Sequence, residues 1–175
     1  SGAVTPALLR LFLFPAFAIT ITLVGCGRSP TRPDQPTPST IIVPAGTNVI
    51  DASNAVLFRA MSLVGTPYRW GGNTPASGFD CSGLVTYIFR DAAAVSLPRQ
   101  SSAMGEIRGR RLSRRQLISG DLVFFAASRS ISHVGVYVGE QRFVHAPNSG
   151  GTVRLDSLNG AWWKDHFVFG KRVFQ

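Results

Sequence analysis

Cysteine, lysine and acidic side chains are all scarce in this 175-residue chain. With only two cysteines, Cys26 and Cys81, a disulfide-stapled scaffold is excluded. The short cysteine and histidine spacings typical of zinc sites are absent as well, which argues against a metal centre. The scarcity of cysteine therefore draws attention to what each of the two thiols does.

The shortage of acidic residues leaves the chain strongly basic. Nine acidic residues stand against 18 basic ones, of which 16 are arginines, and the formal net charge is +9. A basic surface suits nucleic acid, a membrane or an anionic polymer. No nucleic-acid-binding motif is visible, so we expect no nucleic-acid partner, and the charge alone does not choose between the other two.

The longest apolar stretch, residues 8–25, is interrupted by Arg10 and Pro15. Spanning a bilayer takes about 20 apolar residues, and the uninterrupted part here is shorter, as in the core of a signal peptide. The stretch ends at Leu23-Val24-Gly25-Cys26, which resembles the lipobox of bacterial lipoproteins. The resemblance implies a signal peptide over residues 1–25 and a diacylglycerol on Cys26. A membrane anchor or a plain secretory signal is the alternative.

Residues 26–50 contain five prolines among serine, threonine, arginine and glutamine. Such a segment forms no packed core, and we expect a semi-extended tether behind the lipidated Cys26. Gly27, where an aspartate would retain a Gram-negative lipoprotein at the inner membrane, implies sorting to the outer membrane. We therefore expect a lipid-anchored protein of the cell envelope, on the periplasmic face of the outer membrane.

The folded domain is predicted over residues 51–175. Capping residues and apolar spacing predict a helix from about residue 51 until Gly65-Thr66-Pro67 stops it, and a second helix beginning near Cys81. Four later apolar runs suit strands, and a turn is predicted at residues 139–142. Helices first and strands afterwards favour an α+β fold, with helices packed on a mostly antiparallel sheet. The four strand candidates are residues 121–126, 133–139, 142–146 and 167–174.

One thiol and two imidazoles are the parts of a cysteine nucleophile with its base and an orienting group. Cys81 falls in the first turn of the predicted helix, where free N–H groups stabilise a thiolate or an oxyanion. His133 and His145 fall on two neighbouring predicted strands. The alternatives are an inert buried cysteine with structural histidines, as we expect for His166, or a metal site built from Cys81, His133 and His145.

The motifs in the domain resemble those of the NlpC family of bacterial cell-wall peptidases, which have a papain-like α+β core. The resemblance implies that Cys81 is the nucleophile, His133 the base and His145 the orienting residue. It also implies oxyanion or substrate roles for Tyr68, Asp80, Ser82 and Trp70, with the Ser82 backbone N–H as an oxyanion donor. The matching segments are residues 65–72, 79–84, 97–99, 120–125, 132–139 and 144–146.

The family resemblance implies a murein endopeptidase that cuts peptide-stem or cross-link amide bonds through a cysteine thioester, without a cofactor. The expected partners are peptidoglycan stems and, through the lipid on Cys26, a membrane; we expect a monomer. Two alternatives stay open: a non-catalytic wall-binding lipoprotein, and a papain-like amidase or acyltransferase. Five arginines over residues 108–115 form either a cationic cleft for stem carboxylates or a solvated basic loop.

Overall fold

The computed structural model describes residue 2, residues 41–147 and residues 151–175. The chain divides into two units, Ser1–Gln35 and Pro36–Gln175, and every described helix and strand belongs to the second. The predicted signal peptide, the lipid site Cys26 and the tether as far as residue 40 lie outside the described residues, Gly2 excepted. Among the described helices, none combines the length and apolar content that crossing a membrane requires.

Two helices begin at side-chain caps that the sequence supplies. Asn48 accepts hydrogen bonds from the N–H groups of Ile50 and Asp51 at the start of α1 (Val49–Ser62), as N-cap residues do. Asp80 caps α2 (Cys81–Ala93) by accepting from the Gly83 N–H, and α2 ends at Ala94 in the left-handed conformation. Both helices were predicted, α2 at its observed start, but α1 begins at Val49 with Asn48 as its cap, ahead of the start predicted at about residue 51. The shorter helices are α3 (Ser101–Gly105), the 3-10 turn η1 (Arg114–Gln116) and α4 (Ala161–His166).

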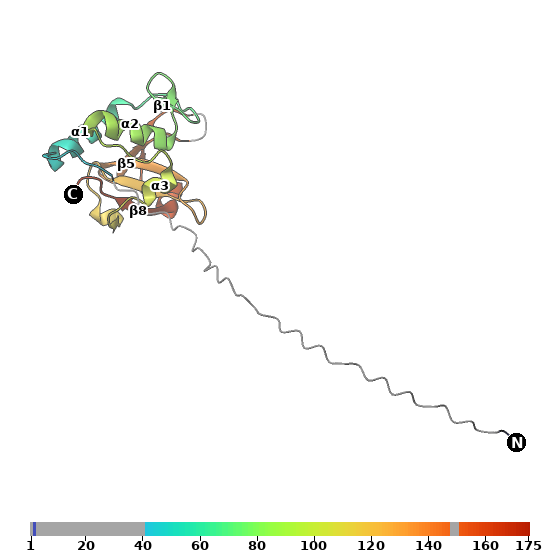
Figure 1. The fold of residues 1–175 in the computed structure, drawn as a ribbon. Helices are drawn as coiled ribbons and strands as arrows, with labels where there is room; N and C mark the ends of the chain where they lie inside the picture. Colours follow the sequence, from blue (N-terminus) through green and yellow to red (C-terminus); the bar gives the residue numbers. More distant parts are fainter. Residues whose placement is uncertain (1, 3–40, 148–150) are drawn as a thin grey trace, which may run out of the picture. The chain divides into compact units, whose positions relative to one another are not determined.

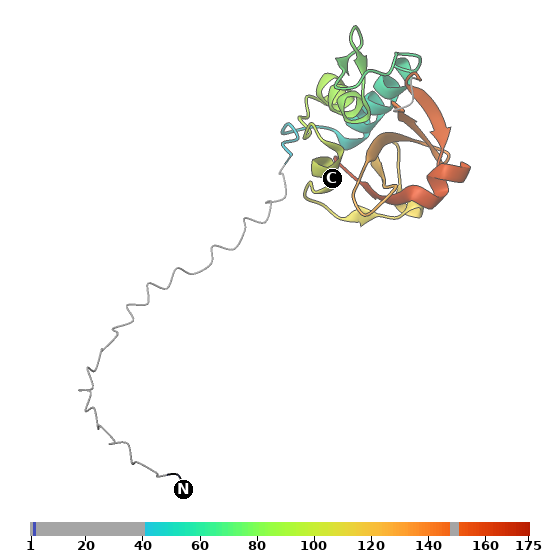
Figure 2. The same cartoon turned by 90° about the vertical axis from the view of Figure 1, so that its right-hand side faces the viewer.

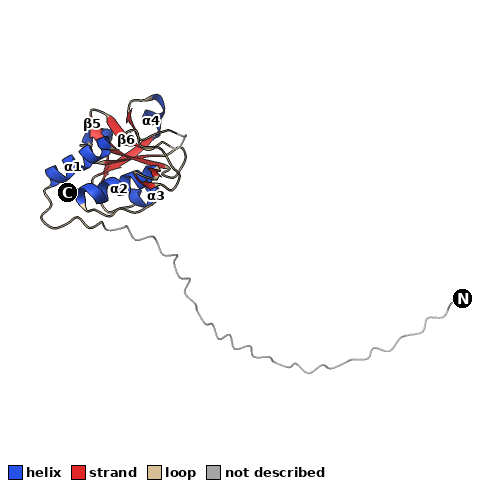
Figure 3. Cartoon of the chain, turned by 90° about the horizontal axis from the view of Figure 1, so that it is seen from above, coloured by secondary structure: helices blue, strands red, loops and turns tan. Residues whose placement is uncertain are grey.

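The main sheet has six strands in the order β3-β8-β4-β5-β6-β7, and every neighbouring pair is antiparallel. Figure 3 shows the strands in red, with β5 and β6 labelled. A separate two-stranded sheet pairs β1 (Asn73–Thr74) with β2 (Gly78–Phe79). The fold is therefore α+β, as predicted. The six strands are β3 (Arg111–Leu112), β4 (Leu122–Phe125), β5 (His133–Gly139), β6 (Arg142–His145), β7 (Arg154–Ser157) and β8 (Phe167–Lys171).

The two faces of the sheet carry separate hydrophobic cores. Helices α1 and α2 lie on one face (Figure 1), where Val134, Val136 and Val144 pack beneath them. The other face packs a second core with Phe125, Phe143 and the partly buried Trp163 of α4, and Figure 2 shows α4 away from α1 and α2. Odd and even residues of β5 thus serve different cores, as alternation along a strand requires.

The turn between β5 and β6 fixes how these two strands face each other. Glu140 and Gln141 both have positive φ angles, 51° and 57°, which is the pattern of a type I′ hairpin turn. The predicted turn at residues 139–142 is confirmed. Because this two-residue loop sets the register, it also sets which residues of β6 lie beside His133.

Several elements escaped the sequence analysis because they are too short to show a period. The polar segment 99–120 contains α3, β3 and η1, and the glycine-containing segment 68–75 contains β1. Strand β7 and helix α4 were not expected at all. Ile41 and Val43 also pack against the core, so the packed part of the chain extends N-terminal to residue 51.

Candidate active site

Cys81 is the first residue of α2, and its thiol meets two opposing influences. Burial and the charge of Asp80 raise the pKa of the thiol, while the backbone N–H groups of Ser82, Val134 and Cys81 itself act to lower it. The raising influences prevail, so the resting thiol is protonated at neutral pH. The same N–H groups are positioned to stabilise the sulfur once it becomes an anion.

Asp80 supports the backbone that carries the thiol. Its Oδ1 accepts from the Gly83 N–H at 2.6 Å and from Arg99 Nη1 at 2.9 Å, and its Oδ2 accepts from the Gly71 N–H at 3.0 Å and from Arg99 Nη2 at 2.6 Å. Burial acts to raise the pKa of Asp80, but the hydrogen bonds from Arg99 and these N–H groups hold it below its ordinary value. Asp80 is therefore a fixed anion.

Arg99 joins this cluster from the loop before α3. Besides its bidentate pair with Asp80, its Nη1 donates to the Ser82 hydroxyl at 2.7 Å, and that hydroxyl donates to Asp80 Oδ1 at 3.3 Å. The Ser82 side chain is thus engaged, and its backbone N–H is the part of the residue suited to an oxyanion. The Leu97-Pro98-Arg99 motif was noted in the sequence, but the role of Arg99 was missed.

His133 of β5 and His145 of β6 meet across the hairpin that these two strands form. His133 Nε2 lies 2.9 Å from His145 Nδ1, within hydrogen-bonding distance. Gly135 makes the approach possible, because a Cβ there would lie 2.8 Å from a ring carbon of Phe143 and 2.9 Å from the Val144 carbonyl oxygen. His133 and His145, predicted to be neighbours, are therefore in direct contact. Position 135, between them on the hairpin, has room only for glycine.

Asp156 of β7 extends this pair into a chain of three groups. Its Oδ2 lies 2.9 Å from His145 Nε2 and also accepts from Arg154 Nη2 at 2.9 Å and Trp163 Nε1 at 3.0 Å. Burial acts to raise the pKa of Asp156, but the bonds from Arg154 and His145 lower it below its ordinary value. Asp156 is an anion at neutral pH, and the sequence analysis did not find it.

Burial keeps both imidazoles neutral. It lowers the pKa of His133 to about 3, helped by His145 and Arg154. It also lowers the pKa of His145 to about 4, although Asp156 acts in the opposite direction. His145 is fully buried, and Trp163 packs edge-on against its ring at a centroid distance of 4.7 Å. At neutral pH each ring therefore carries a single proton.

The Asp156 carboxylate decides which nitrogen holds that proton. A carboxylate only accepts hydrogen bonds, so His145 Nε2 must carry the hydrogen and His145 Nδ1 must be an acceptor. His133 Nε2 must then donate to His145, which leaves His133 Nδ1 with the free lone pair. The hydrogen-bond chain thus makes Nδ1 of His133 the basic atom, as an orienting carboxylate does for other catalytic histidines.

Cys81 and His133 line one cavity of about 590 Å³. Tyr68 and Trp70 line it too; burial and the charges of Cys81 and Asp80 raise the pKa of the Tyr68 phenol, so it stays a hydrogen-bond donor. Trp70 is 87% exposed at this cavity. Six of the seven site residues predicted within the domain line this cavity, and the seventh, His145, lies behind it in contact with His133. The six are Tyr68, Trp70, Asp80, Cys81, Ser82 and His133.

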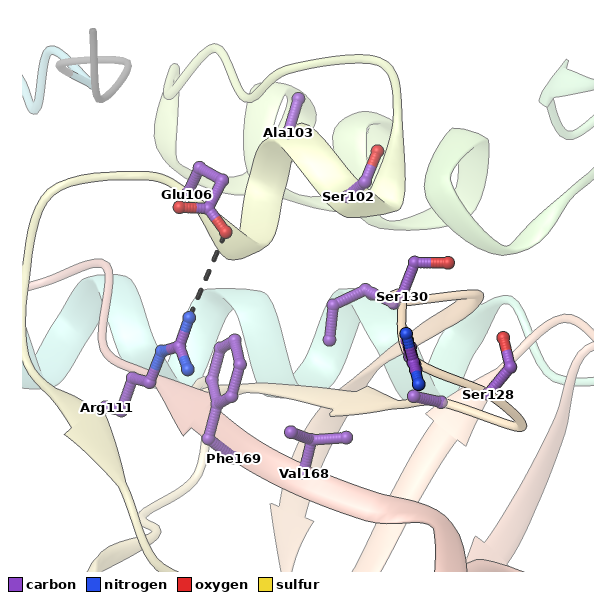
Figure 4. Close-up of a pocket in the computed structure, with 11 residues that line it drawn as sticks. Ser102, Ala103, Glu106, Arg111, Ser128, Ser130, Val168 and Phe169 are labelled. Atoms are coloured by element: carbon purple, nitrogen blue, oxygen red, sulfur yellow. Dashed lines mark ion pairs between the residues drawn. The ribbon is translucent and has the colours of Figure 1, made fainter. Parts of the chain in front are cut away.

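A second cavity of similar size, about 550 Å³, has a different character. Ser102, Arg111 and Phe169 line it, with Glu106 in a 3.9 Å ion pair to Arg111 (Figure 4). It contains neither cysteine nor histidine. Of the five arginines over residues 108–115, the described lining of the Cys81 cavity includes none. Nor does the described part of the chain hold three ligating side chains placed for a metal ion.

Comparison with known proteins identifies the domain. The sequence pattern of the NlpC/P60 family matches residues 65–172, which include the thiol, both imidazoles and Asp156. The chain belongs to the NlpC/P60 family. The match confirms the family predicted from the motifs.

Curated relatives of this NlpC/P60 chain differ in how much of them it spans. It is 39% identical over 125 residues to the murein DD-endopeptidase MepH of Escherichia coli, covering 70% of the chain and 46% of MepH. It is 33% identical over 173 residues to the murein DD-endopeptidase and LD-carboxypeptidase MepS of the same organism, covering 91% of the chain and 90% of MepS. The chain therefore spans about half of MepH but nearly all of MepS.

Solved NlpC/P60 structures share the fold. A family protein from Bacillus cereus superposes with a TM-score of 0.65 at 26% identity, covering 77% of this chain and 42% of that one. The peptidoglycan hydrolase RipB of Mycobacterium tuberculosis superposes with a TM-score of 0.62 at 29% identity, covering 76% and 69% respectively. These neighbours confirm the α+β architecture.

Proposed function

We propose that this protein is a cysteine endopeptidase that hydrolyses amide bonds in the peptide stems or cross-links of peptidoglycan. The observation that carries the proposal is the chain of hydrogen bonds from Asp156 through His145 to His133, which ends in the cavity of Cys81. The names of relatives support the substrate, since MepH and MepS are murein DD-endopeptidases. LytE of Bacillus subtilis, 42% identical over 117 residues, is a probable peptidoglycan endopeptidase.

The reaction starts from a neutral thiol and a neutral imidazole. As Cys81 Sγ attacks the carbonyl carbon of the scissile amide, His133 Nδ1 takes the thiol proton, so an imidazolium forms together with a tetrahedral oxyanion. The C–N bond then breaks, the amine leaves with the proton from His133, and the acyl group stays on sulfur as a thioester. Asp156 stabilises the transient positive charge through His145.

Hydrolysis of the thioester restores the enzyme. Water attacks the thioester carbon while His133 Nδ1 takes a proton from it, and the C–S bond breaks to release the carboxylic acid. The thiol is then reprotonated by His133. Every proton moves through one nitrogen, which is why the tautomer imposed by Asp156 matters in both halves of the reaction.

The N–H groups around Cys81 are the proposed oxyanion donors. The backbone N–H groups of Ser82 and Cys81 lie in the first turn of α2, where helix geometry leaves such groups free, and the protonated Tyr68 phenol adds a side-chain donor. Asp80 and Ser82 act through their contacts with Arg99, by holding this turn in place. Trp70, exposed at the cavity, is a candidate contact for substrate.

The membrane attachment remains part of the proposal. The basis is the Leu23-Val24-Gly25-Cys26 pattern, which predicts a diacylglycerol on Cys26 and an outer-membrane protein facing the periplasm. Mass spectrometry of the mature protein should find a lipidated N-terminal Cys26, and Cys26→Ser should release the protein from membranes. An unlipidated chain that keeps residues before Cys26 would contradict this assignment.

The decisive experiment compares the full chain with its Cys81→Ala variant on purified diaminopimelate-type sacculi, with mass spectrometry of the released fragments. New peptide ends that require Cys81 would establish cleavage and identify the bond, separating an endopeptidase from a carboxypeptidase. Retained cleavage by a folded Cys81→Ala variant would refute the mechanism. Binding without cleavage by either protein would favour the wall-binding lipoprotein instead.

A further inference from the structure

A cavity of about 440 Å³ meets the Cys81 cavity at Ser132 and His133 but does not contain the thiol. Its other walls are Trp162 and Trp163 of α4, Pro147 after β6, and Arg154 of β7; Ala127 completes the lining. The Cys81 cavity and this cavity thus lie on different sides of His133, the proposed base. The 440 Å³ cavity is called the tryptophan cavity below.

The chemistry of amide cleavage assigns the tryptophan cavity to the amine side of the substrate. Cys81 must approach the carbonyl carbon, so the acyl part of the substrate lies over the Cys81 cavity. The leaving nitrogen must reach His133 to receive its proton. Because the tryptophan cavity borders His133 and not Cys81, the residue after the scissile bond is the one that enters it.

Arg154 gives this cavity a cationic wall. Its Nε and Nη2 both donate to Asp156 Oδ2, at 3.0 and 2.9 Å, which fixes the plane of the guanidinium. Among the described residues nothing bonds to Nη1, and the side chain is 49% exposed. An oriented guanidinium with free N–H groups binds carboxylates well.

Trp162 supplies the apolar part of the same cavity. Its ring is stacked on His166 at 3.9 Å with an interplanar angle of 3°, so it is held in place, and it remains 44% exposed. An aliphatic chain can lie against the ring while a charged group at its end reaches Arg154. The cavity therefore combines one rigid apolar wall with one carboxylate receptor.

We propose that the tryptophan cavity is a leaving-group subsite in which Arg154 binds a free carboxylate on the residue that follows the scissile bond. The inference rests on the proposed endopeptidase function and sharpens it. It specifies an amine-side residue with an aliphatic chain and a free carboxylate, as diaminopimelate has. Amidation of that carboxylate should weaken the substrate.

The test uses two synthetic stem peptides that share one scissile bond and differ only in a free carboxylate or a carboxamide on the following residue. The wild-type full chain should cleave the free acid with a kcat/KM about tenfold higher or more, as expected for losing a charged hydrogen bond. Arg154→Gln should remove that preference, and Arg154→Lys should keep part of it. Arg142→Gln, an exposed arginine on β6 outside both cavities, should keep all of it.

Equal losses for both peptides in Arg154→Gln would overturn the subsite, because Arg154 would then act only through Asp156. A preference that survives in Arg154→Gln would overturn it too. Binding to the folded Cys81→Ala variant separates this inference from the proposed function. If the wild type cleaves neither peptide but Cys81→Ala binds the free acid in an Arg154-dependent way, the subsite stands and the endopeptidase assignment fails.

Discussion

Two aspartate–arginine pairs flank the proposed reaction centre, and their carboxylates accept hydrogen bonds in different ways. Asp80, paired with Arg99, accepts hydrogen bonds on both oxygens from side-chain and backbone donors. Asp156, paired with Arg154, receives all of its side-chain donors on Oδ2 alone. One carboxylate clamps a piece of backbone, whereas the other gathers three side chains around a single oxygen.

The difference separates two tasks that a catalytic cysteine needs. Asp80 holds the first turn of α2 and raises the pKa of the nearby thiol, so its contribution is the position of the nucleophile. Asp156 touches neither the thiol nor His133, and acts through His145 on the proton of the base. Substitutions of Asp156 should therefore mainly lower kcat, whereas substitutions of Asp80 should mainly lower the free energy of unfolding.

The largest effect is expected for Asp156→Leu. Without an acceptor, His145 is free to adopt either tautomer, and His133 Nδ1 loses its assignment as the base. We expect kcat to fall by about 10²–10⁴-fold, the range that general acid–base catalysis contributes. Steady-state kinetics on a stem peptide, with a melting curve to verify folding, would measure it; an unchanged kcat would remove Asp156 from the mechanism.

Asp80→Asn should lower the stability of the fold as well as the rate of the reaction. Both Asp80 oxygens face donors, so the amide nitrogen of asparagine must point at an N–H group, and at least one donor loses its acceptor. The free energy of unfolding should fall by about 1 kcal/mol, the net worth of a typical hydrogen bond, measured by urea denaturation. A variant as stable as the wild type would mean that the clamp around Asp80 is not important for the fold.

Asp156→Asn should be milder than either change, and it is the matched control for both. Its carbonyl oxygen can take the place of Oδ2 and accept from all three donors, so the tautomers survive while the negative charge is lost. We expect about a tenfold loss of kcat, from weaker stabilisation of the His133 imidazolium, and nearly unchanged stability. A loss as large as that of Asp156→Leu would show that charge, not tautomer, is the main contribution.

Acid should affect the histidine pair and Asp80 in different pH ranges, with smaller effects than the substitutions above. The pKa values of His133 and His145 are lowered from 6.5 to about 3 and about 4. Below pH 6.5 the unfolded chain therefore binds more protons than the folded protein, and stability falls as the pH falls. The lowered pKa of Asp80 keeps its contribution until the pH drops below its ordinary value of 3.8.

Denaturation at pH 7, 6, 5 and 4.5 tests this difference. Stability should decline steadily over the series, and His145→Asn should flatten the decline because one of the two depressed groups is removed. Asp80→Asn should lower the whole curve without changing its slope in this window. A slope that His145→Asn leaves intact would place the acid sensitivity elsewhere.

Local patterns in the sequence were enough to predict where the proposed catalytic groups lie. Cys81 was predicted at a helix start because a run of apolar residues at helical spacing begins just after it, and His133 and His145 were placed side by side because a short turn joins two strands. The supporting residues were missed for two reasons: the partner of Arg99 is distant in sequence, and Asp156 and Trp163 lie on elements too short to show a period. Arg99 lies 19 residues after Asp80, and Trp163 and Asp156 reach the imidazoles from elements of four to six residues.

One local signal for Asp156 was present in the sequence. In Arg154-Leu155-Asp156, the charged residues alternate with an apolar one, which is the period of a strand with both charges on one face. What the sequence could not supply is the register that pairs His145 with Arg154 and sets Asp156 diagonally across from it. That register depends on how β7, a strand of only four residues, pairs with β6.

The protonated state of the resting thiol also bears on chemical durability. Oxidants and disulfides react with thiolates, and a thiol whose pKa is raised exposes little thiolate to them at neutral pH. In the proposed mechanism Cys81 becomes a thiolate only as His133 withdraws its proton during attack. The unpaired Cys81 thiol should therefore resist oxidation at neutral pH, and its rate of inactivation by hydrogen peroxide should rise with pH as the thiol ionises.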